Sequence, residues 1–210
     1  MAVPPELELV RYRRRVGDLY RLRGEPEAVC ADFRRGRDQL FATHSQSALP
    51  EPDRAAFSGL SYFEYDPRYR VTCVVQPPPE PGEIEIDTGG EDGVMRYRRT
   101  GTVEVPLPEG TGILSLYWLE AYGGGLFLAF RDATSGSETY GGGRYLLDTI
   151  KGTDGLSLEF GAGPGELILD FNYAYNPSCA YNHRWACPLA PRENWLRFPV
   201  RAGERSYAGS

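Results

Sequence analysis

The chain has 210 residues, of which 41% are hydrophobic and 12% aromatic, enough apolar side-chain mass for a folded core. Its net charge of −6 argues against a nucleic-acid partner, because proteins that bind nucleic acids usually present a basic face. No stretch approaches the roughly 18 apolar residues of a membrane helix, and the N-terminus lacks the apolar core of a secretory signal. We therefore expect a cytoplasmic protein without a membrane partner, in which the four cysteines are reduced.

Two amphipathic helices are predicted at the N-terminal end. Residues 6–22 carry apolar side chains at helical spacing behind a pair of prolines, and Gly24 marks the end of this helix. Residues 26–42 repeat the pattern, with Phe33 on the apolar face. The arginine run at 13–15 could indicate an anionic partner, but nearby acidic residues favour a solvated helix face.

From residue 57 the sequence changes to short β-branched or alternating runs bounded by Gly, Pro or Asp. These runs cover residues 70–76, 82–88, 94–107, 112–122, 125–132, 155–161 and 166–172. The glycine-rich stretches at 89–93 and 122–125 suit hairpin turns. This spacing predicts a mainly β fold, an antiparallel β-sandwich or partly closed β-barrel with the two N-terminal helices packed against it. We expect one domain over residues 1–210, with a helical segment at 1–56 and a β-rich body at 57–210.

Five motifs follow one another along the chain. They are "THSQSALP" (43–50), "FSGLSYFEYDPRYRV" (57–71), "FRDATSGSETYGGGRYL" (130–146), "LDFNYAYNPSCAYNHRWACPLAPREN" (169–194) and "VRAGE" (200–204). Together they resemble the domain of unknown function 1684 family of bacteria and archaea, over nearly the whole chain. The resemblance implies no activity, so candidate sites must be argued from the chemistry of the side chains.

The first candidate is the YGGGRY turn, residues 140–145. Three glycines permit a tight bend and a close approach of the backbone to a ligand, and Arg144 follows directly between Tyr140 and Tyr145. A guanidinium in this position could clamp a carboxylate or phosphate. The turn matches neither a Walker loop nor a dinucleotide-binding glycine motif. The alternative is a structural turn whose arginine pairs with Asp132 or Glu138.

The second candidate is the DFN segment, residues 170–182. Asp170 and Asn172 end a predicted strand on the same face, because side chains alternate along a strand. Amide and phenol groups follow at Tyr175, Asn176, Tyr181 and Asn182. Such a cluster either satisfies the backbone of a buried loop or recognises a polar ligand, and Asx turns fit the first interpretation. The sequence leaves both interpretations open.

Cys179, His183 and Cys187 are spaced C-x3-H-x3-C. Three ligands without a further cysteine pair make a weak zinc signal, and we expect no metal and no cofactor. A disulfide would suit an oxidising compartment, whereas in the cytoplasm two thiols can pack as small apolar groups. Cys179 could also be a nucleophile, for which His183 is the nearby base.

The leading interpretation is a protein that binds a small polar, anionic molecule. Arg144 would hold the charge, and the DFN segment would recognise the rest. The predicted ligand-binding residues are Tyr140, Arg144, Tyr145, Asp170, Asn172, Tyr175, Asn176, Tyr181, Asn182 and Glu193. Glu193 could pair with Arg144 or orient the ligand, while His44 is expected to be a helix C-terminal residue.

Two alternatives remain open. The same pocket could be catalytic, with Cys179 and His183 as nucleophile and base, or with Asp170 as a general base. The DFN segment could instead be only a conformational lock. The oligomeric state is not predicted.

Overall fold

The computed structural model describes residues 3–87, 93–149, 152 and 154–207. Helix α1 spans Pro5–Leu19 and helix α2 spans Pro26–Thr43, which confirms the two predicted helices to within a few residues. Helix α2 buries Val29, Cys30, Phe33, Leu40 and Phe41. In the described part of the chain, no helix combines the length and apolarity needed to cross a membrane.

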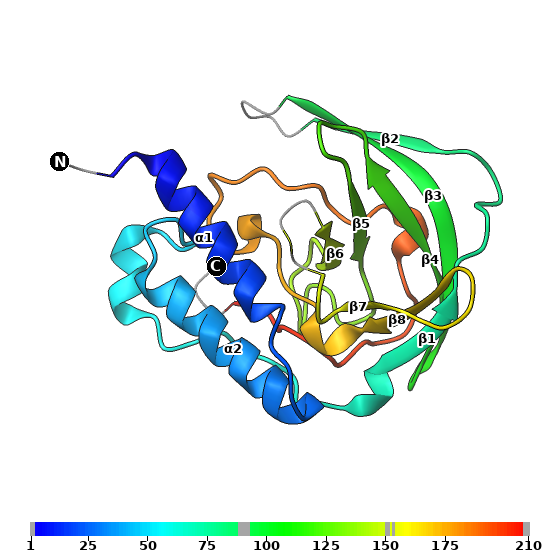
Figure 1. The fold of residues 1–210 in the computed structure, drawn as a ribbon, viewed down its shortest axis with the longest axis horizontal. Helices are drawn as coiled ribbons and strands as arrows, with labels where there is room; N and C mark the ends of the chain where they lie inside the picture. Colours follow the sequence, from blue (N-terminus) through cyan, green and yellow to red (C-terminus); the bar gives the residue numbers. More distant parts are fainter. Residues whose placement is uncertain (1–2, 88–92, 150–151, 153, 208–210) are drawn as a thin grey trace.

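The strands form two antiparallel sheets (Figure 1). The larger sheet has the order β2-β3-β4-β5-β6, from Glu83–Asp87, Val94–Leu107, Gly110–Leu119, Gly125–Phe130 and Arg144–Asp148. The smaller sheet has the order β1-β8-β7, from Arg70–Val74, Glu166–Asp170 and Leu158–Phe160. The predicted mainly β class is confirmed, and the described strands form two sheets instead of a closed barrel. The turn predicted at 89–93 falls largely outside the described residues.

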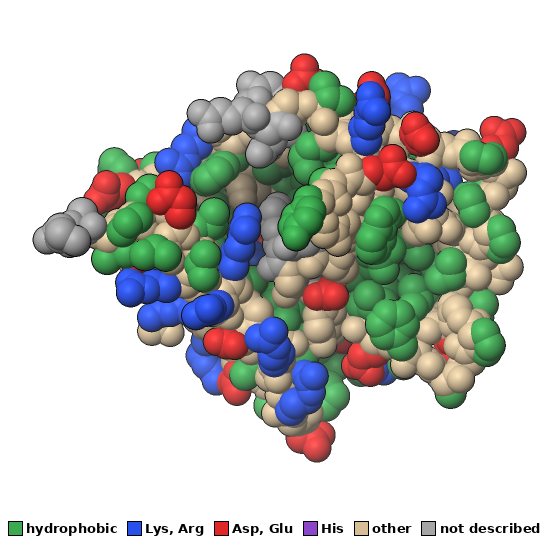
Figure 2. Space-filling model, turned by 45° about the horizontal axis from the view of Figure 1, so that its top comes forward, with side chains coloured by type: hydrophobic (Ala, Val, Ile, Leu, Met, Phe, Trp, Pro, Cys, Tyr) green, Lys and Arg blue, Asp and Glu red, His purple; other side chains and the backbone are tan. Residues whose placement is uncertain are grey.

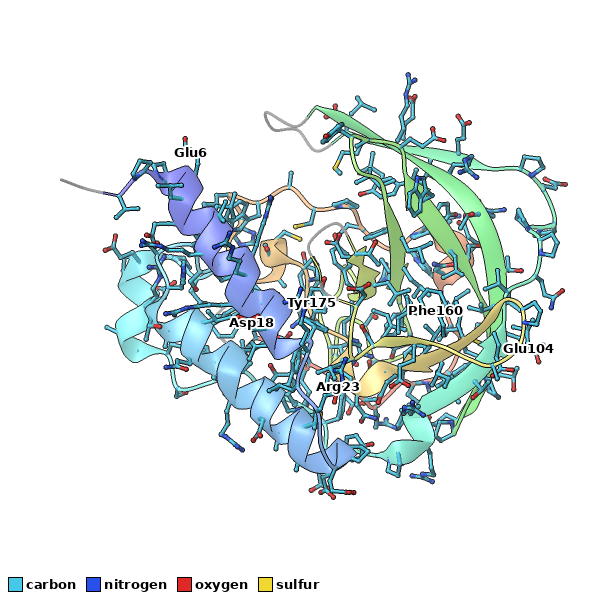
Figure 3. All side chains as sticks on the ribbon, in the orientation of Figure 1. Glu6, Asp18, Arg23, Glu104, Phe160 and Tyr175 are labelled. Carbon is cyan, nitrogen blue, oxygen red and sulfur yellow. The ribbon has the colours of Figure 1, made fainter. Side chains whose placement is uncertain are left out.

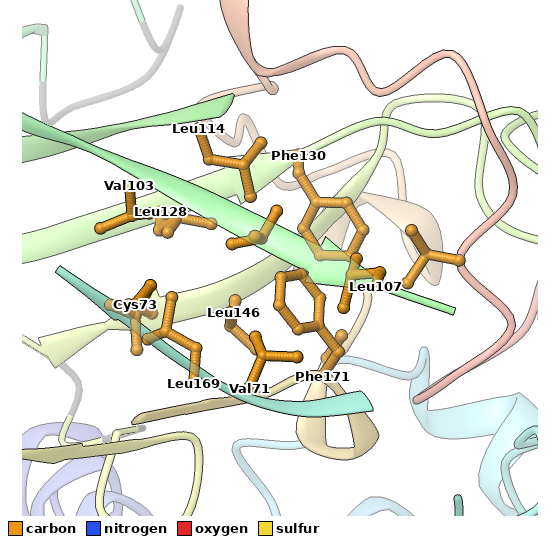
Figure 4. Close-up of a cluster of buried hydrophobic side chains, with 14 of the residues drawn as sticks. Val71, Cys73, Val103, Leu107, Leu114, Leu128, Phe130, Leu146, Leu169 and Phe171 are labelled. Carbon is orange, nitrogen blue, oxygen red and sulfur yellow. The ribbon is translucent and has the colours of Figure 1, made fainter. Parts of the chain in front are cut away.

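A hydrophobic core fills the space between the two sheets (Figure 4). Strand β1 alternates exposed and buried residues, so Val71 and Cys73 point inward. They meet Val103 from β3, while the rings of Phe130 and Phe171 pack edge to face at 5.3 Å. The core therefore anchors Phe130, the last residue of β5, and Phe171, the first residue of the short 3₁₀ helix η4, Phe171–Tyr173. Helix η4 lies near the start of the DFN segment.

Aromatic contacts attach the helices to the DFN segment. The ring of Phe33 packs edge to face against Tyr173, and the ring of Phe41 does the same with Tyr181, at centroid distances of 5.1 and 4.9 Å. Tyr20, just after α1, packs on Phe33 at 4.8 Å. The DFN segment thus lies between the helices and the strands (Figure 1), in contact with both.

Candidate functional site

The structure brings the YGGGRY turn and the DFN segment together. The Tyr145 amide donates to the Tyr175 carbonyl at 2.8 Å, and the Tyr175 amide donates back to Tyr145 at 3.0 Å. The Tyr140 hydroxyl lies 3.7 Å from the Cys179 sulfur. Backbone pairing and side-chain contact thus join two segments that are 30 residues apart in the sequence.

Arg144, the predicted anion clamp, is completely buried and bonded within the chain. Its Nη2 donates to Asp132 Oδ2 at 2.9 Å and to the Val200 carbonyl at 2.7 Å. Its Nη1 donates to the carbonyls of Ala202 and Glu204. Burial lowers the pKa of Arg144, and the Asp132 carboxylate opposes this effect. The geometry is that of the alternative structural role, in which Arg144 pairs with Asp132.

Position 143 requires glycine for two reasons, its backbone conformation and the lack of room for a side chain. Its φ is +91°, a region that L side chains rarely adopt. A Cβ at Gly143 would lie 2.5 Å from the Phe130 carbonyl oxygen and 3.2 Å from the Cβ of Ala190. The YGGGRY turn therefore packs closely against β5. The close approach that Gly143 permits is to the protein backbone and not to a ligand.

Asp170 and Asn172 connect the end of β8 to a distant loop. Asp170 accepts from both the backbone and side-chain nitrogens of Asn172, each at 2.9 Å. The side-chain oxygen of Asn172 accepts from the Asp66 backbone amide at 3.1 Å, and its side-chain nitrogen donates to the Asp66 carbonyl at 2.9 Å. Burial raises the pKa of Asp170, and the Asn172 hydrogen bonds oppose it. Asp170 and Asn172 are both buried and hydrogen-bonded within the chain, which is the pattern of side chains that close a loop through Asx-type hydrogen bonds.

A buried charged network surrounds Asn176. Glu204, 1% exposed, accepts from the Asn176 backbone amide at 3.1 Å, from Arg37 Nη2 at 2.9 Å and from the Tyr181 hydroxyl. The Asn176 side-chain nitrogen donates to the Arg205 carbonyl at 2.8 Å. Among the described residues, the buried Asn176 Oδ1 has no hydrogen-bond partner. This network attaches α2 and the C-terminal segment to the DFN segment.

Cys179 of the DFN segment lies next to Cys187, which follows that segment in the sequence. The Cys179 backbone amide donates to the Cys187 sulfur at 3.3 Å, and both side chains are partly exposed. The pKa of Cys179 is lowered to about 6, first by a hydrogen bond from Cys187, while burial opposes the shift; Tyr140 contributes a further hydrogen bond. His183 is exposed and affects Cys179 only through its charge. Across the described ranges, no group of three or more His, Cys, Asp or Glu could hold a metal ion.

Asn182 shapes the loop between the cysteines. Its side-chain oxygen accepts from the Arg184 amide at 3.0 Å, and its carbonyl accepts from the Trp185 amide at 3.1 Å. This Asx turn reverses the chain and returns Cys187 to Cys179. Asn182 is itself only partly buried, as Cys179 and Cys187 are.

An aromatic cluster lies beside the thiols, on the five-stranded sheet. Phe127 of β5 packs on Tyr97 and on Tyr145, both at 5.0 Å, and Tyr145 packs on Tyr175 at 5.8 Å. The Tyr145 hydroxyl donates to the Pro188 carbonyl at 2.5 Å, one residue beyond Cys187. Tyr175 lies between the helices and the strands (Figure 3), with the Arg37 guanidinium 5.3 Å from its ring centroid. Tyr145 and Tyr175 thus form a rigid apolar wall next to the thiol pair.

Glu193 and His44 have partners other than Arg144. Glu193 accepts hydrogen bonds from Arg99 and the Tyr117 hydroxyl, so its partner is an arginine of β3 and not Arg144. His44 directly follows α2 and accepts from the Gln46 amide at 3.1 Å through Nδ1. Its ring lies edge-on to Tyr12 at a centroid distance of 5.1 Å.

Positive charge gathers over the helices. Figure 2 shows Lys and Arg side chains on the left, the side on which α1 and α2 lie in Figure 1. A hollow of about 540 Å³ on this side is lined by Glu8, Arg11, Arg14, Arg15, Thr43, His44 and Ser45. A second hollow, of about 360 Å³, lies between α1 and the residues Gly152, Asp154 and Gly155. Both are open surface depressions with acidic residues in or beside them.

Comparison with known proteins agrees with the motif resemblance. Residues 55–205 match the model of a family described as "Protein of unknown function (DUF1684)". The chain belongs to this family. An uncharacterized protein of Haloarcula marismortui, solved in solution by NMR, is 35% identical, and the match covers 85% of this chain and 93% of that chain with a TM-score of 0.58. No curated protein matches the chain. The DUF1684 name states no activity, so the function must be argued from the geometry.

Sequence reasoning did not assign Arg37 and Glu204, although both belong to the network around Asn176. Glu204 ends the "VRAGE" motif, so a sequence signal for it existed. Arg37 carries none, because it is one of several arginines on an amphipathic helix. Its partner Glu204 is 167 positions away in the sequence.

Proposed function

We propose that this DUF1684 protein binds a small polar, anionic molecule where the YGGGRY turn meets the DFN segment. One observation carries the proposal. The Tyr140 hydroxyl and the sulfurs of Cys179 and Cys187 converge at a partly exposed point, whereas most other polar groups of the two segments are buried and bonded within the chain. Accessible hydrogen-bonding groups next to an aromatic wall are the usual composition of a small-molecule site.

In this site the residues divide into two groups. Tyr140 and Asn182 would contact the ligand, and the buried rings of Tyr145 and Tyr175 would support the site from behind. Arg144, Asp170, Asn172 and Asn176 would hold the two segments in place, because their side chains bond to backbone and to one another. Positive charge would come from Arg184, which is exposed on the loop between the cysteines.

The test is a thermal-shift titration of the untagged protein with inorganic phosphate, acetate and citrate. A ligand at a hundred times its Kd stabilises the folded state by about 2.7 kcal/mol. For a chain of this length that corresponds to a rise in Tm of about 5–11 °C. We expect Tyr140→Phe, which removes only the hydroxyl, to weaken this response.

A matched control is the double variant Arg14→Ala/Arg15→Ala, which removes cations from the helical hollow. If the proposal is correct, this variant responds to the anions as the wild type does. A response that is lost in the arginine variant and kept in Tyr140→Phe would place the anion on the helices and refute the proposed site. No response from any anion would refute the anionic ligand class represented by these probes.

One observation favours a second candidate, a thiol-dependent enzyme. The lowered pKa of Cys179 gives a thiolate near neutral pH, which is the form that attacks electrophiles. Here Cys187 and Tyr140 would stabilise the thiolate, and His183 would contribute only long-range charge. Once a turnover assay exists, Cys179→Ser is expected to abolish activity and His183→Ala to reduce it only slightly.

A further inference from the structure

The thiols of Cys179 and Cys187 are already close enough for bond formation with little rearrangement. The Cys187 sulfur lies 3.3 Å from the backbone nitrogen of Cys179. Since an N–Cα bond is about 1.5 Å, that sulfur is at most about 4.8 Å from the Cys179 Cα. The Asx turn at Asn182 holds this arrangement from inside the loop.

We propose that Cys179 and Cys187 are a thiol–disulfide exchange site, oxidised reversibly to an intramolecular disulfide by small-molecule disulfides. Two partly exposed cysteines facing each other across one turn have the arrangement of an attacking and a resolving thiol. The inference depends only on the geometry of the thiols. It does not require the ligand of the proposed function.

The chemistry proceeds in two balanced steps. The Cys179 thiolate attacks one sulfur of the small disulfide, forming a mixed disulfide and releasing one small thiolate, which takes up a proton. Cys187 then loses its proton, attacks the Cys179 sulfur and displaces the second small thiol. Overall, two protein thiols are oxidised to a disulfide while one small disulfide is reduced to two thiols, and an excess of small thiol reverses the reaction.

The other two cysteines provide internal controls. Cys30 is 1% exposed and Cys73 is 5% exposed, so neither is accessible to a small disulfide. Burial raises the pKa of each to about 11, the opposite direction from Cys179. A reagent that reacts with thiols through their thiolates should therefore distinguish the facing pair from the buried pair in one folded protein.

Oxidation would also change the contact between the DFN segment and the YGGGRY turn. The Tyr140 hydroxyl lies 3.7 Å from Cys179 Sγ and stabilises it as a thiolate. A disulfide sulfur carries no charge, so this hydrogen bond weakens when Cys179 is oxidised. The redox state of the pair is thereby connected to the loop that carries Tyr140.

The experiment uses the full chain, incubated with excess oxidised glutathione at pH 6.5, quenched with acid, alkylated under denaturing conditions and analysed by peptide mass mapping. We expect a chain two hydrogens lighter, with Cys179 linked to Cys187 and with Cys30 and Cys73 alkylated. Reduced glutathione in excess should restore four alkylated cysteines. Two unmodified facing thiols, a bond to Cys30 or Cys73, or a bond between two chains would each overturn the proposal.

Two single variants assign the attacking thiol. Cys187→Ser should stop at a glutathione adduct on Cys179. Cys179→Ser should form its adduct on Cys187 about tenfold more slowly than the wild type forms its disulfide at pH 6.5, because the variant lacks the thiol whose pKa is lowered. Both variants are checked for folding by circular dichroism. Equal rates would show that Cys179 is not the attacking thiol and would overturn that part of the mechanism.

Discussion

Replacement of Arg144 by lysine tests whether this residue holds the fold together or holds a ligand. The guanidinium reaches Asp132 on one side and three carbonyls of the C-terminal segment on the other. Lysine keeps the positive charge and much of the length. Its single ammonium group cannot reproduce the planar fork, so Asp132 or several carbonyls would lose their donor inside the core.

The expected cost follows from burial. The Arg144–Asp132 pair has side-chain exposures of 0% and 1%, and breaking a buried ion pair costs about 3–5 kcal/mol. For a protein of this size, each kcal/mol lowers Tm by about 2–4 °C, so Arg144→Lys should lower it by about 6–20 °C. Arg201→Lys is the matched control, because the Arg201–Glu138 pair is half exposed and such pairs contribute about 0–1 kcal/mol.

The assay is thermal unfolding of the ligand-free proteins, followed by far-UV circular dichroism. A loss of less than about 2 °C in Arg144→Lys, comparable with Arg201→Lys, would refute the structural role of Arg144. If Arg144 were instead the anion clamp, its replacement would leave the ligand-free protein stable and abolish the thermal response to anions. The two roles therefore predict opposite patterns in the same pair of measurements.

Three further predictions concern the same region. Asn172→Ala should lower Tm by about 4–12 °C in a thermal melt, because the Asp66 backbone groups lose both partners at a cost of about 2–3 kcal/mol. Gly203→Ala should destabilise the protein more than Gly123→Ala in urea titrations. Both glycines have positive φ, but only at Gly203 would a Cβ meet backbone, 2.4 Å from the Ala174 oxygen. The rate of Cys179 alkylation by iodoacetamide should rise with pH through a midpoint near 6, since only the thiolate reacts. In Cys187→Ala the midpoint should move upward, because alanine has no donor to replace the hydrogen bond that contributes most to stabilising the thiolate.

The sequence predicted the elements whose patterns are local. Helix α2 at Pro26–Thr43 and strand β3 at Val94–Leu107 match their predicted ranges almost residue for residue, because one face of each is apolar at the spacing of its element. Strand β6, Arg144–Asp148, was not predicted as a strand. All five of its residues are buried, so its sequence shows no alternation of apolar and polar residues. Its residue Tyr145 also pairs with the distant Tyr175, and no local sequence pattern can indicate such a pairing.

The candidate site was predictable only in part, for a related reason. The sequence analysis placed residues 140–145 and 170–182 in one proposed pocket, and the structure joins the two segments by a backbone pair. The direction of the Arg144 side chain depends on carbonyls at 200, 202 and 204, and backbone carbonyls leave no mark on residue type. Sequence reasoning therefore could not choose between a ligand and the chain itself as the partner of Arg144.

The polar residues of the YGGGRY turn and the DFN segment fall into a buried group and a partly exposed group, and the two groups suit different roles. Arg144, Asn172 and Glu204 are buried, and hydrogen bonds to backbone and to other side chains offset the cost of removing them from water. Such a network fixes one arrangement of the loops, since a displaced loop would leave several buried groups unpaired. Cys179 and Tyr140 lie at the partly exposed edge of that arrangement. The proposed site and the conformational lock are therefore compatible interpretations: a buried lock would hold the thiols and the Tyr140 hydroxyl at fixed positions, and reactions with thiol reagents are expected to change this edge while the fold persists.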